Sequence, residues 1–400
     1  MQHLMKSFVF TLISLLMNTL FSAVSFANIH ALPQPTVMIP APPQLAAKTY
    51  LLVDYLSDYV IAEQDIDQRV EPASLTKMMT VYVIDHEIKN GKLKLTDPVK
   101  ISEKAWRTEG TRMFVDVNSL VSVNDLLHGI IIQSGNDASV ALAEHTAGSE
   151  STFAAVMNHY AKQLGMVNTH FTNATGLPDP NHYTTARDMA ILAKAVIRDF
   201  PETYKIYAQK EFFYHDIKQE NRNRLLWRND LVDGIKTGHT DSAGYCLVAS
   251  GQKNNMRLIA VVMGTKNDSA RTEETNKLLM YGFQFFETRK LYPASTALKK
   301  ARVWMGTQKE VDVGLLDDLY VTIGQGQYDQ LNSNIELLPE IKAPTLVGTT
   351  VGTLAIQLNK KTLIERPLVA LSPVAESGFF GRMVDTIVFN INALWEKVST

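Results

Sequence analysis

The sequence predicts an α+β protein in which an antiparallel sheet flanked by helices is followed by a small all-β domain and a C-terminal amphipathic helix. Three observations predict this order. Strand-like stretches at 49–53 and 257–263 enclose a helix-rich middle. From Ala294 to Val374 the pattern changes to short alternating apolar runs separated by glycine and proline. Beyond residue 378, apolar residues recur at helical spacing.

The N-terminus has the pattern of a secretory signal. Lys6 precedes an apolar run from Phe8 to Phe21, and small residues follow at Ser25 and Ala27. This pattern predicts a signal peptide in 1–27 that is cleaved after Ala27. An uncleaved membrane anchor is the alternative, which the short and partly polar run disfavours. The proline-rich segment 28–45 is predicted to be an extended lead-in.

Composition excludes several functional classes. The formal net charge of −2 argues against a nucleic-acid partner. The single cysteine, Cys246, excludes an intramolecular disulfide, and its apolar neighbours predict a buried small side chain rather than a catalytic thiol. His86-Glu87 lacks a second histidine at the helical metal-binding spacing. The sequence therefore predicts neither a metal site nor a cofactor.

Three short motifs stand in a fixed order in the first domain. They are Ser74-Leu75-Thr76-Lys77, Ser134-Gly135-Asn136 and Lys236-Thr237-Gly238. Each alone is a weak signal, since 250–253 also fits the first pattern and 122–124 the second. Their combination, widely spaced and in this order, is a strong one.

The first motif fits an activated serine nucleophile. A serine hydroxyl needs a base to remove its proton, and a lysine can be that base only when it is neutral. Pro72 opens an apolar helical stretch, so Ser74 and Lys77 share one face a single turn apart. Burial, the helix dipole and a second cation at Lys236 all disfavour a charged Lys77.

The other two motifs supply partners for this pair. Ser134 and Asn136 precede a helix over 137–144, from which they can relay a proton and hold a substrate amide. The third motif lies in the first strand of a predicted pair, and Gly238 there allows a substrate backbone to lie against the strand edge. Arg222 and Arg224 either support the site electrostatically or form surface ion pairs.

The ordered motifs are the signature of penicillin-binding proteins and serine β-lactamases. The chain resembles the low-molecular-mass penicillin-binding proteins, specifically D-alanyl-D-alanine carboxypeptidases anchored by their C-terminus. The likeness extends to 183–190, 236–240 and 365–369, and it covers nearly all of the mature chain. It implies the same α+β catalytic fold, with an antiparallel sheet flanked by helices.

The resemblance also implies roles for individual residues. Ser74 would be acylated, Lys77 would be its base, and Ser134 and Asn136 would complete the proton network. Substrate binding would fall to a second group, in which the lysine, threonine and arginine hold the terminal carboxylate: Lys236, Thr237, Gly238, His239 and Arg271. Arg271 is expected in the loop after the strand that ends at Met263-Gly264. The backbone N–H groups of Ser74 and His239 would form the oxyanion hole.

One position departs from the family pattern. Thr175 stands before Gly176-Leu177, where close relatives can carry histidine. The departure lies in the loop over the site.

Three functions from different classes fit these residues. The first is a carboxypeptidase that removes the terminal D-Ala from peptidoglycan pentapeptides through an acyl-serine intermediate and is acylated by β-lactam antibiotics. The second is a serine β-lactamase, whose deacylating glutamate has no counterpart in 168–182. The third is a non-catalytic scaffold, which the intact Ser74, Lys77 and Lys236 disfavour. The carboxypeptidase is the favoured function.

The remaining segments predict the domain boundaries and the cellular location of the protein. The catalytic domain is expected over 46–292, the all-β domain over 293–374 and the amphipathic helix over 375–400. Its stripe of Phe380, Val384, Ile387 and Ile391 predicts a helix lying in the membrane surface, with Trp395 as a further interfacial anchor. Packing on the protein's own β domain is the alternative. Together with the signal peptide, the helix predicts a periplasmic enzyme held on the outer face of the inner membrane.

Overall fold

The computed structural model describes residues 39–399, so the predicted signal peptide at 1–27 and the first part of the lead-in, 28–38, lie outside the described residues. Residues 39–45 have no regular secondary structure. Ile39 and Leu45 nevertheless pack against a hydrophobic cluster, and the Tyr281 hydroxyl donates a 2.8 Å hydrogen bond to the Pro40 carbonyl. The end of the lead-in is therefore attached to the catalytic domain.

The catalytic domain is built on an antiparallel sheet of five strands. The predicted strands near its two ends pair directly, with Leu52 opposite Ala260, so the enclosing pair is confirmed. In sheet order the strands are β2 (Val60–Gln64), β1 (Thr49–Asp54), β9 (Met256–Thr265), β8 (Gly244–Lys253) and β7 (Val232–Thr240).

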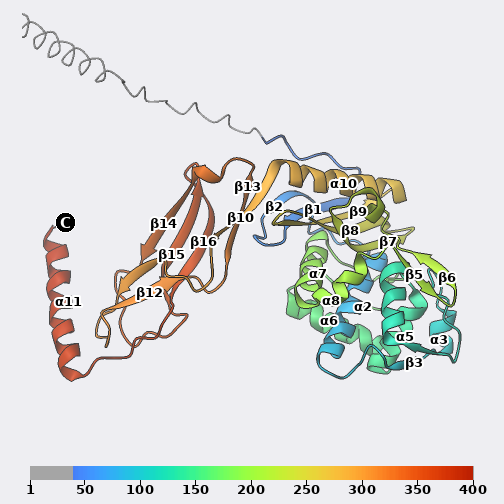
Figure 1. The fold of residues 1–400 in the computed structure, drawn as a ribbon, viewed down its shortest axis with the longest axis horizontal. Helices are drawn as coiled ribbons and strands as arrows, with labels where there is room; N and C mark the ends of the chain where they lie inside the picture. Colours follow the sequence, from blue (N-terminus) through green and yellow to red (C-terminus); the bar gives the residue numbers. More distant parts are fainter. Residues whose placement is uncertain (1–38, 400) are drawn as a thin grey trace, which may run out of the picture. The chain divides into compact units, whose positions relative to one another are not determined.

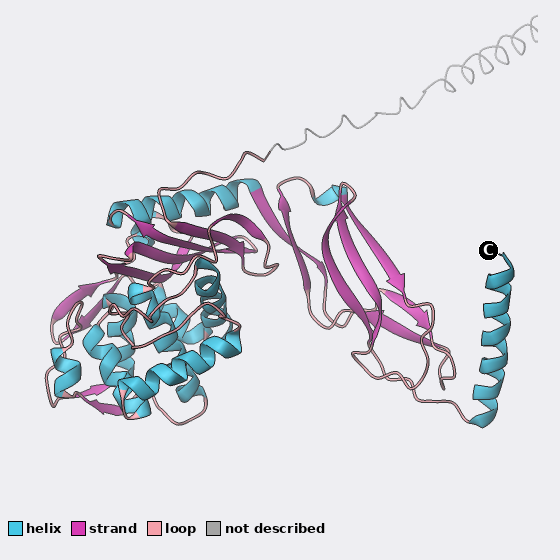
Figure 2. Cartoon of the chain, turned by 180° about the vertical axis from the view of Figure 1, so that it is seen from behind, coloured by secondary structure: helices cyan, strands magenta, loops and turns pink. Residues whose placement is uncertain are grey.

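Helices cover both faces of this sheet (Figures 1 and 2). One long helix lies on one face, α10 (Asp268–Phe285), and its Leu278 and Leu279 share a buried cluster with Leu258. The other face carries the remaining longer helices: α2 (Lys77–Lys89), α5 (Asn136–Ala147), α6 (Glu150–Leu164), α7 (Ala186–Asp199) and α8 (Pro201–Tyr207).

Short elements complete the domain and carry much of the site. A 3₁₀ turn η1 (Ala73–Thr76) leads into α2, and a π-helical turn η2 (Gly129–Gln133) precedes α5. The others are the hairpins β3 (Pro98–Lys100) with β4 (Leu120–Ser122) and β5 (Glu211–Tyr214) with β6 (Ile217–Glu220), and the helices α3 (Glu103–Arg107), α4 (Val123–His128) and α9 (Leu225–Arg228).

The second domain is all-β, as predicted. Its five-stranded antiparallel sheet runs β11 (Lys299–Arg302), β12 (Glu310–Gly314), β16 (Lys361–Ala370), β15 (Thr350–Leu358) and β14 (Leu331–Leu337). A 3₁₀ turn η3 (Tyr328–Gln330) precedes β14. β13 (Leu319–Gly324) instead pairs with β10 (Phe286–Tyr292). The last strand in the range predicted for the catalytic domain thus shares a ladder with the second domain, a long-range pairing that composition does not reveal.

The C-terminal segment forms α11 (Phe379–Ser399), and two of its faces differ. Asp385 is buried against the β domain, where it accepts the Met305 N–H at 2.9 Å and pairs with Lys309 at 2.6 Å. One turn further, Phe389 meets Trp304 edge to face, with ring centroids 5.2 Å apart. The helix therefore packs on its own domain along one side, which was the alternative to membrane binding.

The predicted apolar stripe of α11 lies on the other side and is exposed. Phe380 and Ile387, for example, expose 77% and 52% of their surface. Residues four apart share a helix face, so Asp385 and Phe389 lie on one face, which contacts the β domain. The exposed stripe lies on a different face of the helix. Among the described residues no helix combines the length and apolar character needed to cross a bilayer.

Candidate active site

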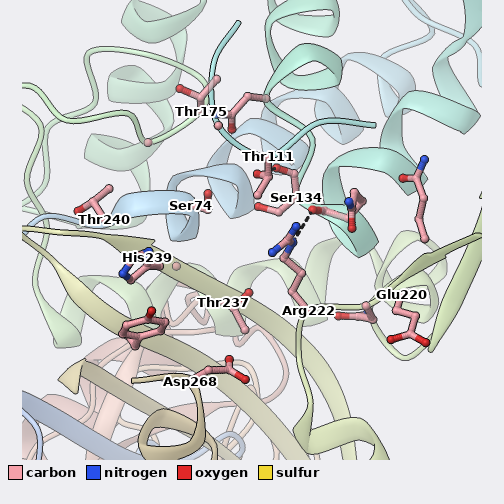
Figure 3. A pocket seen from close by; sticks show the side chains of 18 of the residues that line it. Ser74, Thr111, Ser134, Thr175, Glu220, Arg222, Thr237, His239, Thr240 and Asp268 are labelled. Atoms are coloured by element: carbon pink, nitrogen blue, oxygen red, sulfur yellow. Dashed lines mark hydrogen bonds between the residues drawn. The ribbon is translucent and has the colours of Figure 1, made fainter. Parts of the chain in front are cut away.

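The three motifs meet at one cavity of about 810 Å³ (Figure 3). Figure 3 shows Ser74 on the helical side, opposite Thr237 and His239 on the β7 strand. Seven of the nine predicted site residues line this cavity: Ser74, Ser134, Asn136, Thr237, Gly238, His239 and Arg271. The two lysines lie beneath its wall, where Lys77 is fully buried and Lys236 is 2% exposed.

Ser74 and Lys77 are held by the junction of η1 and α2. Ala73, just before the serine, adopts a left-handed φ of 47°, a backbone conformation that non-glycine residues adopt at an energetic cost. The Lys77 Nζ lies 2.9 Å from the Ser74 Oγ, 2.6 Å from the Asn136 Oδ1 and 2.7 Å from the Thr175 carbonyl oxygen. The predicted pairing of serine and lysine within one turn is thus present.

Burial lowers the pKa of Lys77 to about 7; Asp137 opposes this effect and Arg222 adds to it. The sequence also predicted a contribution from a charged Lys236. The pKa of Lys236 is itself well below its ordinary value, first because of burial and then because of Lys77, Arg222 and Arg271. Since Lys236 is also driven toward its neutral form, burial is the main cause of the shift at Lys77.

The second motif forms the turn between η2 and α5. Ser134 adopts a left-handed φ of 67°, and its carbonyl accepts a 2.6 Å hydrogen bond from the Thr111 hydroxyl. The Asn136 Nδ2 donates to the Glu109 carbonyl at 2.5 Å. This contact fixes the amide orientation, because the oxygen must then point toward Lys77.

Asp137 has a structural role at the site that the three motifs did not predict. Its carboxylate is fully buried and accepts the backbone N–H groups of Met113 at 2.8 Å and of Phe114 at 2.9 Å. It thereby ties the 110–115 loop, one wall of the cavity, to the start of α5. The only sequence signal is an acidic residue directly after Asn136, at a helix N-terminus where an anion is favoured.

The third motif lies in β7, with Lys236 opposite Val248 in the neighbouring strand, as predicted. The structure explains why glycine is needed at position 238 by close packing within the protein, whereas the sequence suggested close approach of a substrate. A Cβ atom there would lie 2.9 Å from the Pro72 carbonyl and 3.3 Å from the Ala73 Cβ. Glycine lets the strand pack against the segment that carries Ser74.

Arg271 lies in the first turn of α10 rather than in a loop, which corrects the predicted element. Its guanidinium donates to the Gly238 carbonyl at 3.1 Å, pairs with Asp268 and lies over the Tyr245 ring. Burial lowers the pKa of Arg271, and Asp268 opposes this change. The cation is thus held at the edge of the third motif.

Arg222 and Arg224, for which the sequence left a supporting role or a surface ion pair open, make different contacts. The Arg222 Nε donates to the Gln133 carbonyl at 3.1 Å, next to Ser134, so Arg222 braces the second motif. Arg224 also lines the cavity, but half of its side chain is exposed and it pairs with Glu220 at 2.9 Å. Within the described residues, no group of three or more His, Cys, Asp or Glu side chains is arranged to hold a metal ion.

Comparison with known proteins identifies the family. Residues 36–267 match the family model described as D-alanyl-D-alanine carboxypeptidase. The chain belongs to this family. Residues 286–376 match the model of the C-terminal domain of penicillin-binding protein 5. The predicted serine-type D-Ala-D-Ala carboxypeptidase is thereby confirmed over the β-lactamase and scaffold alternatives.

Individual relatives agree over most of the chain. The D-alanyl-D-alanine carboxypeptidase DacA of Haemophilus influenzae is 46% identical over 360 residues, which cover 88% of this chain and 92% of the relative. The structure of penicillin-binding protein 5 from the same organism matches with a TM-score of 0.82 and 45% identity, over 84% of this chain and 100% of that one.

A structure with lower sequence identity bears on inhibitor binding. Penicillin-binding protein D2 of Listeria monocytogenes in an ampicillin-bound form matches with a TM-score of 0.56 and 28% identity, over 60% of this chain and 100% of that one. The match shows that the catalytic fold of this chain is similar to one that holds a β-lactam.

Proposed function

We propose that Ser74 attacks the peptide bond between the two terminal D-Ala residues of a peptidoglycan pentapeptide, with Lys77 as its base. The observation that carries this proposal is the set of three oxygen atoms around the Lys77 Nζ. A neutral lysine amine has two N–H bonds and one lone pair. The Asn136 Oδ1 and the Thr175 carbonyl oxygen can only accept, so they take the two N–H bonds. The lone pair then faces the Ser74 hydroxyl.

This arrangement supports the acylation step. The Ser74 proton passes to Lys77 as the Ser74 Oγ forms a bond to the scissile carbonyl carbon. The backbone N–H groups of Ser74 and His239, two residues on opposite walls of the cavity, are proposed to stabilise the oxyanion. Ser134 and Asn136 are proposed to relay the proton to the departing D-Ala amine. Water then hydrolyses the acyl-serine.

The terminal carboxylate is proposed to bind at Thr237, Arg271 and Lys236. The Thr237 and Arg271 side chains line the cavity, whereas Lys236 lies beneath them and donates to the Thr237 carbonyl at 3.2 Å. An arriving carboxylate favours the charged form of Lys236, because an adjacent anion offsets the burial that opposes its charge. Gly238 and His239 shape the strand edge on which the peptide lies.

Removing the carboxylate partners should impair recognition of a free chain end. Thr237→Val and Arg271→Ala are each expected to lower kcat/KM on D-Ala-D-Ala peptides by about 10- to 100-fold, since a charge-assisted hydrogen bond contributes about 1.5–3 kcal/mol. The matching C-terminal amides, which carry no carboxylate, should lose much less. Steady-state kinetics on paired acid and amide substrates measures the difference.

Arg187→Ala is the control for this experiment, because Arg187 pairs with Asp67 at the surface and is not part of the cavity wall. Its kinetics should match those of the unaltered enzyme on both substrates. Equal losses on acids and amides in the Thr237 and Arg271 variants would refute a carboxylate-binding role.

We also propose that β-lactam antibiotics acylate Ser74 and that the adduct is long-lived. The loop over 168–182 contains no glutamate to activate water. The ampicillin-bound relative supports acylation by this class of inhibitor.

The mature enzyme is proposed to be periplasmic and to lie on the outer face of the inner membrane through α11. The exposed stripe of α11 supports this proposal, and its opposite face docks on the β domain. The catalytic domain is assigned to 46–292, the β domain to 293–374 and the anchor to 375–400. Few cations lie on the polar face, so membrane binding should depend on apolar burial and survive moderate salt.

Ending the chain after Val374 should release a soluble enzyme that cleaves small peptides at near-normal rates. Ile387→Asp should weaken binding in the full chain, because it places a charge in the apolar stripe. Thr386→Asp is the matched control, since it adds the same charge on the side away from the stripe. Co-sedimentation with vesicles measures all three proteins. If the truncated protein still sediments with vesicles, the anchor lies elsewhere in the chain.

A further inference from the structure

A buried histidine, His182, forms hydrogen bonds that connect the loop carrying Thr175 to the segment that contains Ser74 and Lys77. His182 is 2% exposed, and its Nε2 lies 2.8 Å from the Oγ1 of Thr76, a residue between Ser74 and Lys77 in the chain. Its Nδ1 lies 3.3 Å from the Thr172 backbone N and 3.1 Å from the Thr172 Oγ1. The imidazole thus bridges the two segments that surround the base.

The hydrogen-bond pattern defines the tautomer. The Thr172 backbone N–H can only donate, so the His182 Nδ1 must accept. The Nε2 of the neutral ring then carries the proton and donates it to the Thr76 hydroxyl. Burial lowers the pKa of His182 to about 4; Asp179 opposes this change, while His170 and Lys77 add to it. The ring is therefore neutral throughout the neutral pH range.

The fastened loop makes close contact with the start of α2. The Ala174 carbonyl accepts the Thr80 hydroxyl at 2.7 Å, and the next carbonyl, of Thr175, accepts Lys77. Gly176 has a φ of +84°, and a Cβ atom there would lie 1.8 Å from the Ala73 carbonyl oxygen. The loop therefore closes over Lys77 and keeps water from its amine.

We propose that His182 is a positioning residue for acylation: it holds the 172–177 loop on the first motif, so that the Thr175 carbonyl orients the Lys77 amine and the loop shields it from water. This inference rests on the proposed role of Lys77 as base. His182 itself touches neither substrate nor the reacting atoms.

The causes of the lowered Lys77 pKa determine how loosening the loop should change that pKa. Losing the carbonyl acceptor alone lowers the pKa of Lys77, because an acceptor favours the charged amine. Admitting water raises it, because burial is the largest cause of the depression. The second effect dominates, so loosening the loop should move the acid limb of the acylation rate to higher pH.

The test compares variants by their rate of penicillin acylation from pH 5 to pH 10. His182→Leu removes all three hydrogen bonds of the ring. We expect its acid limb to move up by about one pH unit, with an acylation rate about fivefold lower at pH 7. His182→Gln carries a donor and an acceptor on one planar amide, so it should restore most of the rate and the unshifted limb.

Two further variants make the result specific. Thr76→Val keeps the side-chain shape but removes the partner hydroxyl, so it should reproduce the shifted limb even if His182→Leu does not fold. His170→Leu is the matched control, because its Nδ1 bonds to the Asn181 carbonyl within the 168–182 loop rather than to the first motif. Its limb should not move.

The outcomes separate this proposal from the proposed function. If the unaltered enzyme acylates and both His182→Leu and Thr76→Val keep its pH profile, His182 has no positioning role. A shifted limb that His182→Gln does not restore also overturns the proposal, because the hydrogen bonds are then not the cause. If the unaltered enzyme forms no acyl adduct at all, the proposed function fails instead.

Discussion

Ser74→Ala is expected to abolish both peptide hydrolysis and penicillin labelling, with a loss on the order of 10⁴-fold or more, as for other serine nucleophiles that act in a concerted group. The variant removes the Ser74 hydroxyl, which lies 2.9 Å from the Lys77 amine. The fold should persist, because Ser74 lines the cavity and the substitution removes a single oxygen at its wall. Mass spectrometry of the labelled protein locates the adduct.

Two other serines provide the controls for this result. Ser250 also stands three residues before a lysine in the sequence, but it is buried in β8, where its hydroxyl accepts from Arg257 at 2.7 Å. Ser250→Ala should therefore label normally. An adduct on Ser134 or Ser250 in the unaltered enzyme would contradict the assignment of Ser74 as nucleophile.

The proximity of Ser74, Lys77 and their neighbours could be predicted from the sequence because these residues stand in short motifs. Ser74 and Lys77 lie within one turn, so local helical geometry alone brings them together. The paired strands around Lys236 and the helix after Asn136 follow from apolar patterning and turn residues in the same way. These features depend on interactions between residues that are close in the chain.

The missed contacts depend on residues far apart in the chain. Backbone carbonyls of Glu109 and Thr175 orient the Asn136 amide and the Lys77 amine, yet a carbonyl has no residue type for a motif to detect. The bond of His182 to Thr76 spans 106 residues. Similarly, the pairing of β10 with β13 and the burial of Asp385 on the β domain are set by tertiary packing.

The sequence predicts the wrong element for Arg271. Its position after a strand indicated a loop, but Asn267 caps a helix there by accepting the Ala270 N–H at 2.8 Å. The cap places Arg271 in the first turn of α10, where it reaches the Gly238 carbonyl. The proposed binding of a carboxylate by Arg271 is compatible with either element, since a loop or a helix at this position can place the guanidinium beside β7.

Lys77→Met is expected to lower the rate of penicillin acylation by about 10²- to 10⁴-fold, the usual contribution of a general base. In the unaltered enzyme the rate should rise with pH through an apparent pKa near 7, because only the neutral amine accepts the Ser74 proton and burial lowers the pKa of Lys77 to about 7. The Met variant should lose this pH dependence along with most of the rate. Stopped-flow measurement from pH 5 to pH 10 records both effects.

Lys77→Arg separates a base from a fixed positive charge. Arginine stays protonated throughout this range, so it preserves the cation but cannot accept a proton. If Lys77 acts as the base, the Arg variant should be as slow as the Met variant. If the charge alone mattered, Arg should retain much of the activity, and the unaltered enzyme should keep its rate down to pH 5. Lys77 contributes to the lowered pKa of Lys236, so the two amines titrate as a coupled pair and the measured pKa belongs to that pair. A Lys236→Met variant should leave the acid limb near pH 7, because burial rather than Lys236 is the main cause of the lowered pKa of Lys77.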